Sequence, residues 1–127
     1  MERFGMVRPR MAVLLFAVLA LAAVAFAADV DGTWTSTFDT QIGEQHYTYN
    51  FKADGEKLTG TAKNDWGERP IEDGTIKGDA VAFTENVEFQ GQKITIKYTG
   101  KLSGDEIKFT RQVGTFATEE ITAKRKK

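Results

Sequence analysis

The sequence predicts an all-β protein, an eight-stranded antiparallel up-and-down β-barrel preceded by an N-terminal signal helix. Three observations predict it: apolar and polar residues alternate with period two from Gly32 onward, short glycine-containing turns separate the alternating stretches, and residues 74–84 recur in outline as residues 100–110. Alternation gives each strand one dry and one wet face, and closure into a barrel is the simplest way to remove exposed edges. A sandwich of the same strands is the alternative.

The chain begins with the features of a secretory signal peptide. Arg3, Arg8 and Arg10 precede an uninterrupted apolar run over residues 11–27, which ends in small residues. We expect cleavage after Ala27 or one residue later, which leaves a signal peptide over residues 1–27 and a single domain over residues 28–127. Retention of the run as an anchor is the alternative. After cleavage the domain has no stable membrane anchor, so we expect a secreted or periplasmic protein.

The charge balance of the expected mature domain argues against a nucleic-acid surface. The whole chain has 17 Lys and Arg against 18 Asp and Glu, and residues 1–27 contain three of the basic and one of the acidic side chains. The mature domain therefore has a net charge of −3, with four positive charges gathered in residues 124–127. Nucleic-acid binding needs basic residues clustered on a folded face. The chain has no cysteine, so the domain is expected to be stable without disulfides.

The alternation and the turns place eight strands in order. They are expected at residues 32–40, 46–53, 57–63, 70–77, 80–90, 93–102, 106–113 and 117–125. Glycine in the turns supplies the positive φ that tight hairpins need, and aspartate caps the backbone. The repeat of residues 74–84 spans one strand, turn, strand and turn, so it is a folding repeat. Its Gly-Asp pair is a turn rather than a metal or phosphate motif.

The inward faces of these strands are rich in aromatic residues. Seven are expected to point into the barrel: Phe38, Tyr49, Phe51, Phe83, Phe89, Tyr98 and Phe109. Only Gly60, Ala62 and Gly100 make room for them. An eight-stranded barrel is just wide enough to be filled by side chains or to hold one small ligand. The aromatic volume favours a packed interior.

A short stretch resembles a known group of barrels. Gly-Thr-Trp at residues 32–34, followed by Ala-Asp-Gly-Glu-Lys-Leu-Thr-Gly-Thr at residues 53–61, resembles the first strands of avidin and streptavidin, and its Gly-x-Trp element is shared with lipocalins in the calycin group. The resemblance implies a structural role for Trp34, packed at the closed end of the barrel under a basic residue of the last strand, here Arg125. The biotin-site residues are not reproduced.

No catalytic or metal-binding constellation stands out. His46 is the single histidine, there is no cysteine, and nothing near Ser36 or Ser103 resembles a nucleophile elbow. We therefore expect a protein that is not an enzyme and that uses no metal or cofactor. An acid-base enzyme built on Glu85 is a minor alternative.

Glu85 and Arg111 occupy equivalent positions in the repeat, each after Phe-Thr on an inward face. Their strands run in the same direction, so both side chains are expected inside the barrel at similar height. There they can pair across the lumen or contact a ligand near the mouth. The alternative is that each emerges into water at the rim.

One barrel end is expected to gather the loops that bind a partner. It combines Trp66 with amide side chains, among them Gln45 and Gln92, a composition suited to a neutral polar partner. His46, at the start of the second strand, is a further candidate for binding, and an ordinary surface or rim histidine is the alternative. We expect a monomeric or weakly oligomeric module that binds a glycan, an envelope component or a protein there. The alternative is a carrier of a small apolar or amphipathic molecule held between Trp66 and the pair of Glu85 and Arg111. Trp66 as a plug of the barrel end is the structural alternative.

Overall fold

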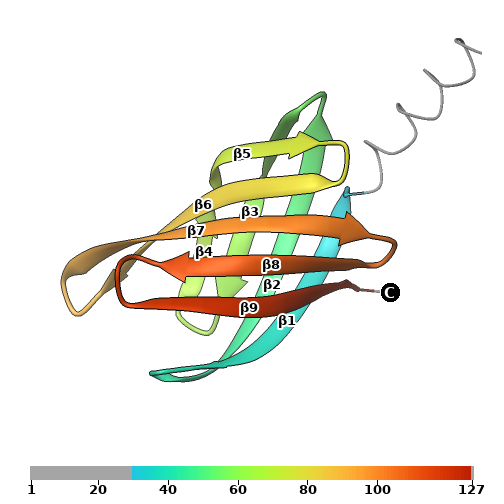
Figure 1. Cartoon of the computed structure of the whole chain (residues 1–127). Helices are drawn as coiled ribbons and strands as arrows, with labels where there is room; N and C mark the ends of the chain where they lie inside the picture. The colour runs from blue at the N-terminus through green and yellow to red at the C-terminus, as the bar shows by residue number, and fades with distance from the viewer. Residues whose placement is uncertain (1–29, 127) are drawn as a thin grey trace, which may run out of the picture.

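The computed structural model describes residues 30–126 as a β-barrel (Figure 1). The signal peptide and its expected cleavage site lie outside the described residues. Within them, no helix is long and apolar enough to cross a membrane. The strands are β1 (Gly32–Thr40), β2 (Gly43–Asp54), β3 (Lys57–Asn64), β4 (Gly67–Pro70), β5 (Glu72–Lys77), β6 (Ala80–Phe89), β7 (Gln92–Ser103), β8 (Glu106–Val113) and β9 (Ala117–Arg125).

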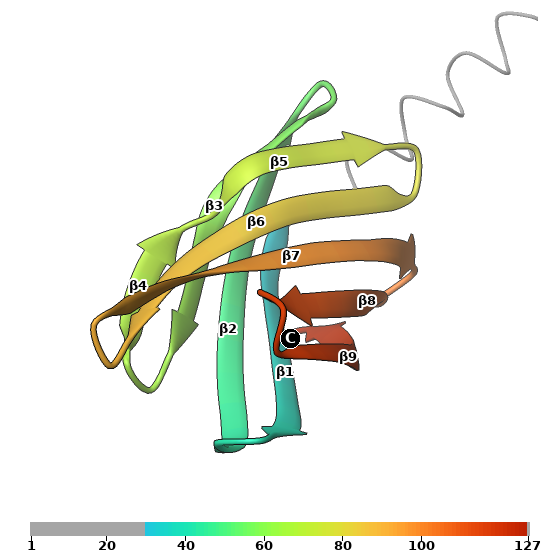
Figure 2. The same cartoon turned by 60° about the vertical axis from the view of Figure 1, so that its left-hand side comes forward.

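The sheet closes on itself through antiparallel pairings. Its strand order is β2-β1-β9-β8-β7-β6-β5-β3-β4, and an additional pairing of β2 with β3 completes the ring. The first and last strands meet with Trp34 opposite Arg125. Figures 1 and 2 show the strands wrapping around one interior. The expected antiparallel barrel is confirmed, and the sandwich alternative is wrong.

The expected fourth strand, residues 70–77, begins earlier, at Gly67, and is interrupted at Ile71. β4 and β5 flank Ile71, and both pair with β3. Together they occupy one strand position, so the nine strand segments form an eight-stranded barrel. The pairing of β5 with β6 shifts register between Glu72 and Thr75, and Asp73 between them has a φ of 52°, as in a β-bulge. Within the described residues β4 has no backbone pairing with β6. Side chains connect these two strands instead.

The second strand begins earlier than expected, at Gly43 instead of residue 46. Thr40 is paired with Gly43, and its hydroxyl donates to the Gly43 carbonyl at 2.8 Å, which makes the hairpin tight. The extension places Gln45 in the strand, two residues before Tyr47. Because side chains alternate across a strand, Gln45 shares the inward face of Tyr47.

Aromatic side chains fill the closed half of the barrel. Phe83 and Tyr98 stack with ring centroids 4.3 Å apart, and Phe109 meets both rings edge-on at 5.6 and 5.5 Å. A Cβ at Gly100 would lie 2.5 Å from Cδ1 of Phe109, so only glycine leaves this ring its place. The expected packed interior is therefore correct for this half alone.

The floor of the barrel joins the two ends of the domain. Trp34 is fully buried and donates from its indole nitrogen to the Val30 carbonyl at 2.9 Å. The guanidinium carbon of Arg125 lies 4.4 Å from the Trp34 ring centroid. Arg125 also donates to the Asp31 carbonyl at 2.8 Å and to Asp105 at 3.0 Å. The structure thus brings Trp34 and Arg125 together at the closed end.

Candidate functional site

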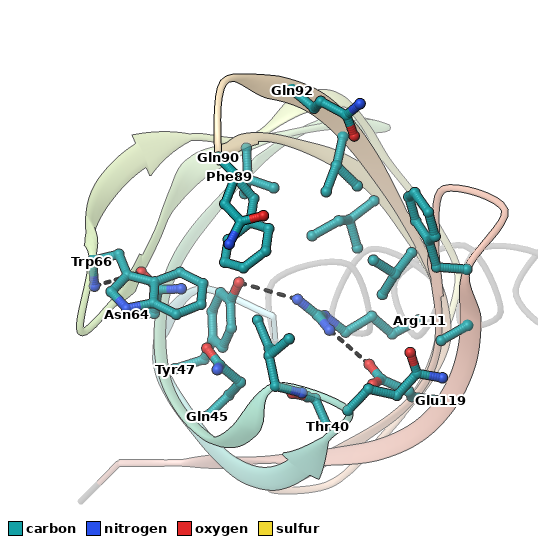
Figure 3. A pocket seen from close by; sticks show the side chains of 18 residues that line it. Thr40, Gln45, Tyr47, Asn64, Trp66, Phe89, Gln90, Gln92, Arg111 and Glu119 are labelled. Carbon is teal, nitrogen blue, oxygen red and sulfur yellow. Dashed lines mark hydrogen bonds and ion pairs between the residues drawn. The ribbon is translucent and has the colours of Figure 1, made fainter.

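The opposite half of the barrel opens into a cavity of about 470 Å³, which we call the cup (Figure 3). The loops at residues 41–42, 65–66, 90–91 and 114–116 surround its opening. Its volume falls in the range of about 300 to 1,000 Å³ that is usual for small-molecule sites. The expectation of a fully packed interior is wrong for this half, because aliphatic side chains replace aromatic ones on the inward faces of β7 and β8.

The cup has two chemically different walls. Successive strands β6, β7 and β8 form an apolar wall whose side chains are Val87, Phe89, Ile94, Ile96 and Val113. The strands on the other side form a polar wall that includes Gln45, Tyr47, Asn64 and Glu119. The two walls differ because the inward-facing residues near the mouth are mainly apolar on β6 to β8 and mostly polar on the other strands. A molecule in the cup therefore has apolar groups on one side and hydrogen-bonding groups on the other.

Arg111 lies at the bottom of the cup, only 5% exposed. Its Nη1 donates to Oε1 of Glu119 at 2.6 Å. Its Nε donates to the Tyr98 hydroxyl at 2.9 Å, and its Nη2 donates to the Tyr47 hydroxyl at 3.1 Å. The guanidinium is thus held in place by one carboxylate and two phenols.

Glu85 is fully buried and does not line the cup. It accepts hydrogen bonds from the Tyr47 hydroxyl at 3.0 Å and from the Tyr98 hydroxyl at 2.9 Å. Nη1 of Arg69, at the open side between β4 and β6, donates to the same carboxylate at 2.5 Å. We call the connected set Arg69, Glu85, Tyr47, Tyr98, Arg111 and Glu119 the polar network.

Burial keeps the phenols of the polar network protonated. It is the main reason why the pKa of Tyr47 is raised to about 12, and the nearby charge of Glu85 adds to the effect. Burial also raises the pKa of Tyr98 well above its ordinary value. For Arg111, burial acts to lower the pKa, but contacts with Tyr98, Tyr47 and Glu119 raise it by more. At neutral pH the hydroxyls therefore donate to a carboxylate and accept from a guanidinium.

Gln45 has hydrogen-bonding capacity that the protein itself does not use. Its side chain lines the cup and the residue is only 9% exposed. Among residues 30–126 its carboxamide has no hydrogen-bond partner. No buried side-chain nitrogen or oxygen of the described residues lacks a partner, so the carboxamide is accessible, and it offers two donors and one acceptor. Gln45 is thus available to a molecule in the cup.

The rim of the cup carries exposed apolar side chains. Ile42, Trp66 and Phe116 are 53%, 58% and 62% exposed and come from three different loops. Trp66 stacks on Phe89 with ring centroids 5.8 Å apart, and its backbone N–H donates to Asn64. At this exposure Trp66 is a wall of the opening, so the expectation of a plug is wrong.

Most of the residues singled out in the sequence meet at the cup. Trp66, Gln45, Gln92 and Arg111 line it, and the buried Glu85 accepts a hydrogen bond from Tyr47 of its lining. His46 does not take part, because its neighbours in β2 occupy the inward positions. It is exposed on the outside of the barrel, where Nε2 lies 3.1 Å from Glu44.

Glu85 and Arg111 do not emerge into water, so the rim alternative is wrong. Nor do they form the direct pair that was considered, because the hydroxyls of Tyr47 and Tyr98 lie between them. Glu119, which was not predicted, is paired with Arg111 in the ladder between β8 and β9. Counting outward from the expected strand ends at residues 113 and 117 would have found it.

Comparison of the chain with known protein families, with curated proteins and with solved structures found no match. The description of the cup therefore depends on this chain alone.

Proposed function

We propose that the mature domain is an exported, non-enzymatic binding protein that holds one small amphipathic molecule in the cup. The observation that carries the proposal is the division of the cup into an apolar wall on β6 to β8 and a polar wall opposite, with Arg111 of β8 at the bottom. Apolar pockets with a few converging polar groups are the usual form of small-molecule sites. An apolar body and a polar head would satisfy the two walls together.

Two further observations support a ligand in the cup. The closed half of the barrel is packed with rings, whereas the mouth half leaves about 470 Å³ that its own side chains do not fill. The carboxamide of Gln45 has no partner among the described residues, although it is nine-tenths buried. A ligand would fill this space and hydrogen-bond to the accessible carboxamide.

The proposal includes export and a distant relationship to calycins. The leader over residues 1–27 supports cleavage and a periplasmic or secreted location. The stacking of Arg125 on Trp34 at the closed end supports the relationship that the Gly-Thr-Trp element predicts. The threonine, lysine and glutamate residues on the outward strand faces support a monomer or weak oligomer.

Binding of N-phenyl-1-naphthylamine, a neutral fluorophore that brightens in apolar surroundings, tests the proposal on protein from a host that expresses the full chain. Ala117→Trp places an indole in the cup, and Thr118→Trp places it on the outward face of the same strand. We expect Ala117→Trp to weaken binding about tenfold or more and Thr118→Trp to leave it unchanged. Equal binding by both variants would place the fluorophore elsewhere.

The rim supports a second candidate, which is docking of an envelope component, a glycan or a protein. Three large apolar side chains, Ile42, Trp66 and Phe116, are exposed around one opening, and exposed patches of this kind are typical of interaction sites. Co-sedimentation with isolated cell envelopes separates the candidates. Rim docking predicts loss with Trp66→Ala and retention with Ala117→Trp.

A further inference from the structure

We propose that the cup selects neutral molecules whose polar head both accepts and donates hydrogen bonds, such as a hydroxyl or a primary amide, and that it discriminates against carboxylates. This inference rests on the proposed function of the cup and specifies the class of ligand. It is carried by the charge balance of the polar network and by the hydrogen-bonding groups that remain free above it.

The polar network is already neutral as a unit. Arg111 is paired with Glu119 at 2.6 Å, and Arg69 is paired with Glu85 at 2.5 Å, so two cations face two carboxylates. An entering carboxylate would meet a guanidinium whose charge is already compensated, and it would add a third anion in a poorly solvated site. Burying an uncompensated charge is costly. An entering ammonium group meets the same difficulty, because both carboxylates already have their cations.

Neutral hydrogen-bonding capacity, in contrast, remains available. A guanidinium has five N–H donors, and Arg111 donates three of them to Tyr98, Tyr47 and Glu119. Gln45 adds a carbonyl acceptor and an NH₂ donor, neither of which has a partner within the described range. Both side chains line the same cup (Figure 3). A hydroxyl or amide uses donors and acceptors together, whereas a carboxylate can only accept.

A series of ligands with one chain length tests the preference directly. Decan-1-ol, decanamide, decanoate and decylamine are compared at neutral pH by displacement of N-phenyl-1-naphthylamine. We expect the alcohol and the amide to bind at least about tenfold more tightly than decanoate and decylamine. Tighter or equal binding of decanoate to the wild-type protein would overturn the inference.

Glu119→Gln tests the cause of the preference. The substitution keeps the shape of the side chain but removes the carboxylate that neutralises Arg111. We expect decanoate to bind about tenfold more tightly to this variant, while the affinity for decan-1-ol changes less than about twofold. The control is Glu120→Gln, which removes the same charge from the outward face, where Glu120 accepts a hydrogen bond from Thr110. It should leave the order of affinities unchanged.

The outcomes separate the inference from the proposed function. If Glu119→Gln and Glu120→Gln strengthen decanoate binding equally, overall charge accounts for the effect and the inference is wrong. If the compounds compete for the cup but decanoate binds best, the inference alone fails. If none of them displaces the fluorophore and Ala117→Trp has no effect, the proposed function fails as well. Thermal melts of each variant verify that it is folded.

Discussion

Glu85 and Arg111 are joined by two hydroxyl groups and not by a direct ion pair. Tyr47 and Tyr98 each donate to Glu85 and accept from Arg111. Each charge has its own counter-ion on the far side, Arg69 for Glu85 and Glu119 for Arg111. The barrel therefore contains a charged layer between its packed half and the cup, and this layer makes the floor of the cup polar.

The first prediction concerns the stability of this layer. Glu85→Gln removes a buried charge and leaves Arg69 without its counter-ion. We expect the free energy of unfolding to fall by about 3 kcal/mol, as when one partner of a buried ion pair is removed. Glu88→Gln, on the exposed face of the same strand, is the control and should change it by less than about 0.5 kcal/mol. Urea denaturation measures both, and similar values would show that the buried charge has no special role.

Tyr47 predicts a loss of stability at alkaline pH. Burial raises the pKa of its phenol to about 12 from an ordinary value of 10.0. Above about pH 10 the unfolded chain therefore loses this proton while the folded protein keeps it, and stability falls as pH rises towards about 12. The loss from Tyr47 is up to about 3 kcal/mol, since each pKa unit corresponds to roughly 1.4 kcal/mol.

Urea unfolding at a series of alkaline pH values checks this prediction. Tyr47→Phe should show a shallower decline than the wild-type protein over the same range. A remaining decline is expected in the variant, because burial also raises the pKa of Tyr49 and of Tyr98. Identical slopes in the two proteins would contradict the assignment.

The exposed position of Trp66 predicts that its replacement weakens binding but has little effect on stability. Its ring is largely exposed and stacks on Phe89, so Trp66→Ala should lower the free energy of unfolding by about 1 kcal/mol or less. Removal of this wall should weaken fluorophore binding about fivefold to tenfold. Trp66→Phe keeps an aromatic face and is the control, with binding close to wild type. A large fall in stability with unchanged binding would identify Trp66 as structural.

The close packing around Gly100 predicts that a larger residue at this position destabilises the closed half of the barrel. A methyl group there meets the ring of Phe109, at 2.5 Å, and the backbone carbonyl of Lys108, at 2.7 Å. We expect Gly100→Ala to destabilise the protein by about 2 kcal/mol, as in other overpacked cores. Thr99→Ala, the exposed neighbour in β7, is the control and should have little effect. A stable Gly100→Ala variant would show that this half is loosely packed.

Some parts of the site were within reach of sequence reasoning and others were not. The inward positions of Glu85 and Arg111 follow from strand alternation, which is a local pattern. The pairing of Arg111 with Glu119 follows from a hairpin and its turn. Arg69 was out of reach, because it precedes the expected fourth strand and approaches Glu85 from β4. No local pattern predicted β4.

The sequence by itself determined most of the strands, their turns and the face of each that is buried, because a period of two and the preferences of turn residues are properties of short segments. The resemblance of Gly-Thr-Trp to the calycin element implied the contact of Trp34 with Arg125, which the closure of β1 on β9 brings about. Only the tertiary structure decided which inward side chains meet across the barrel. Strand tilt and register set those heights together around the closed ring. The two tyrosines between Glu85 and Arg111, and the cup above them, therefore appear only once the sheet has closed.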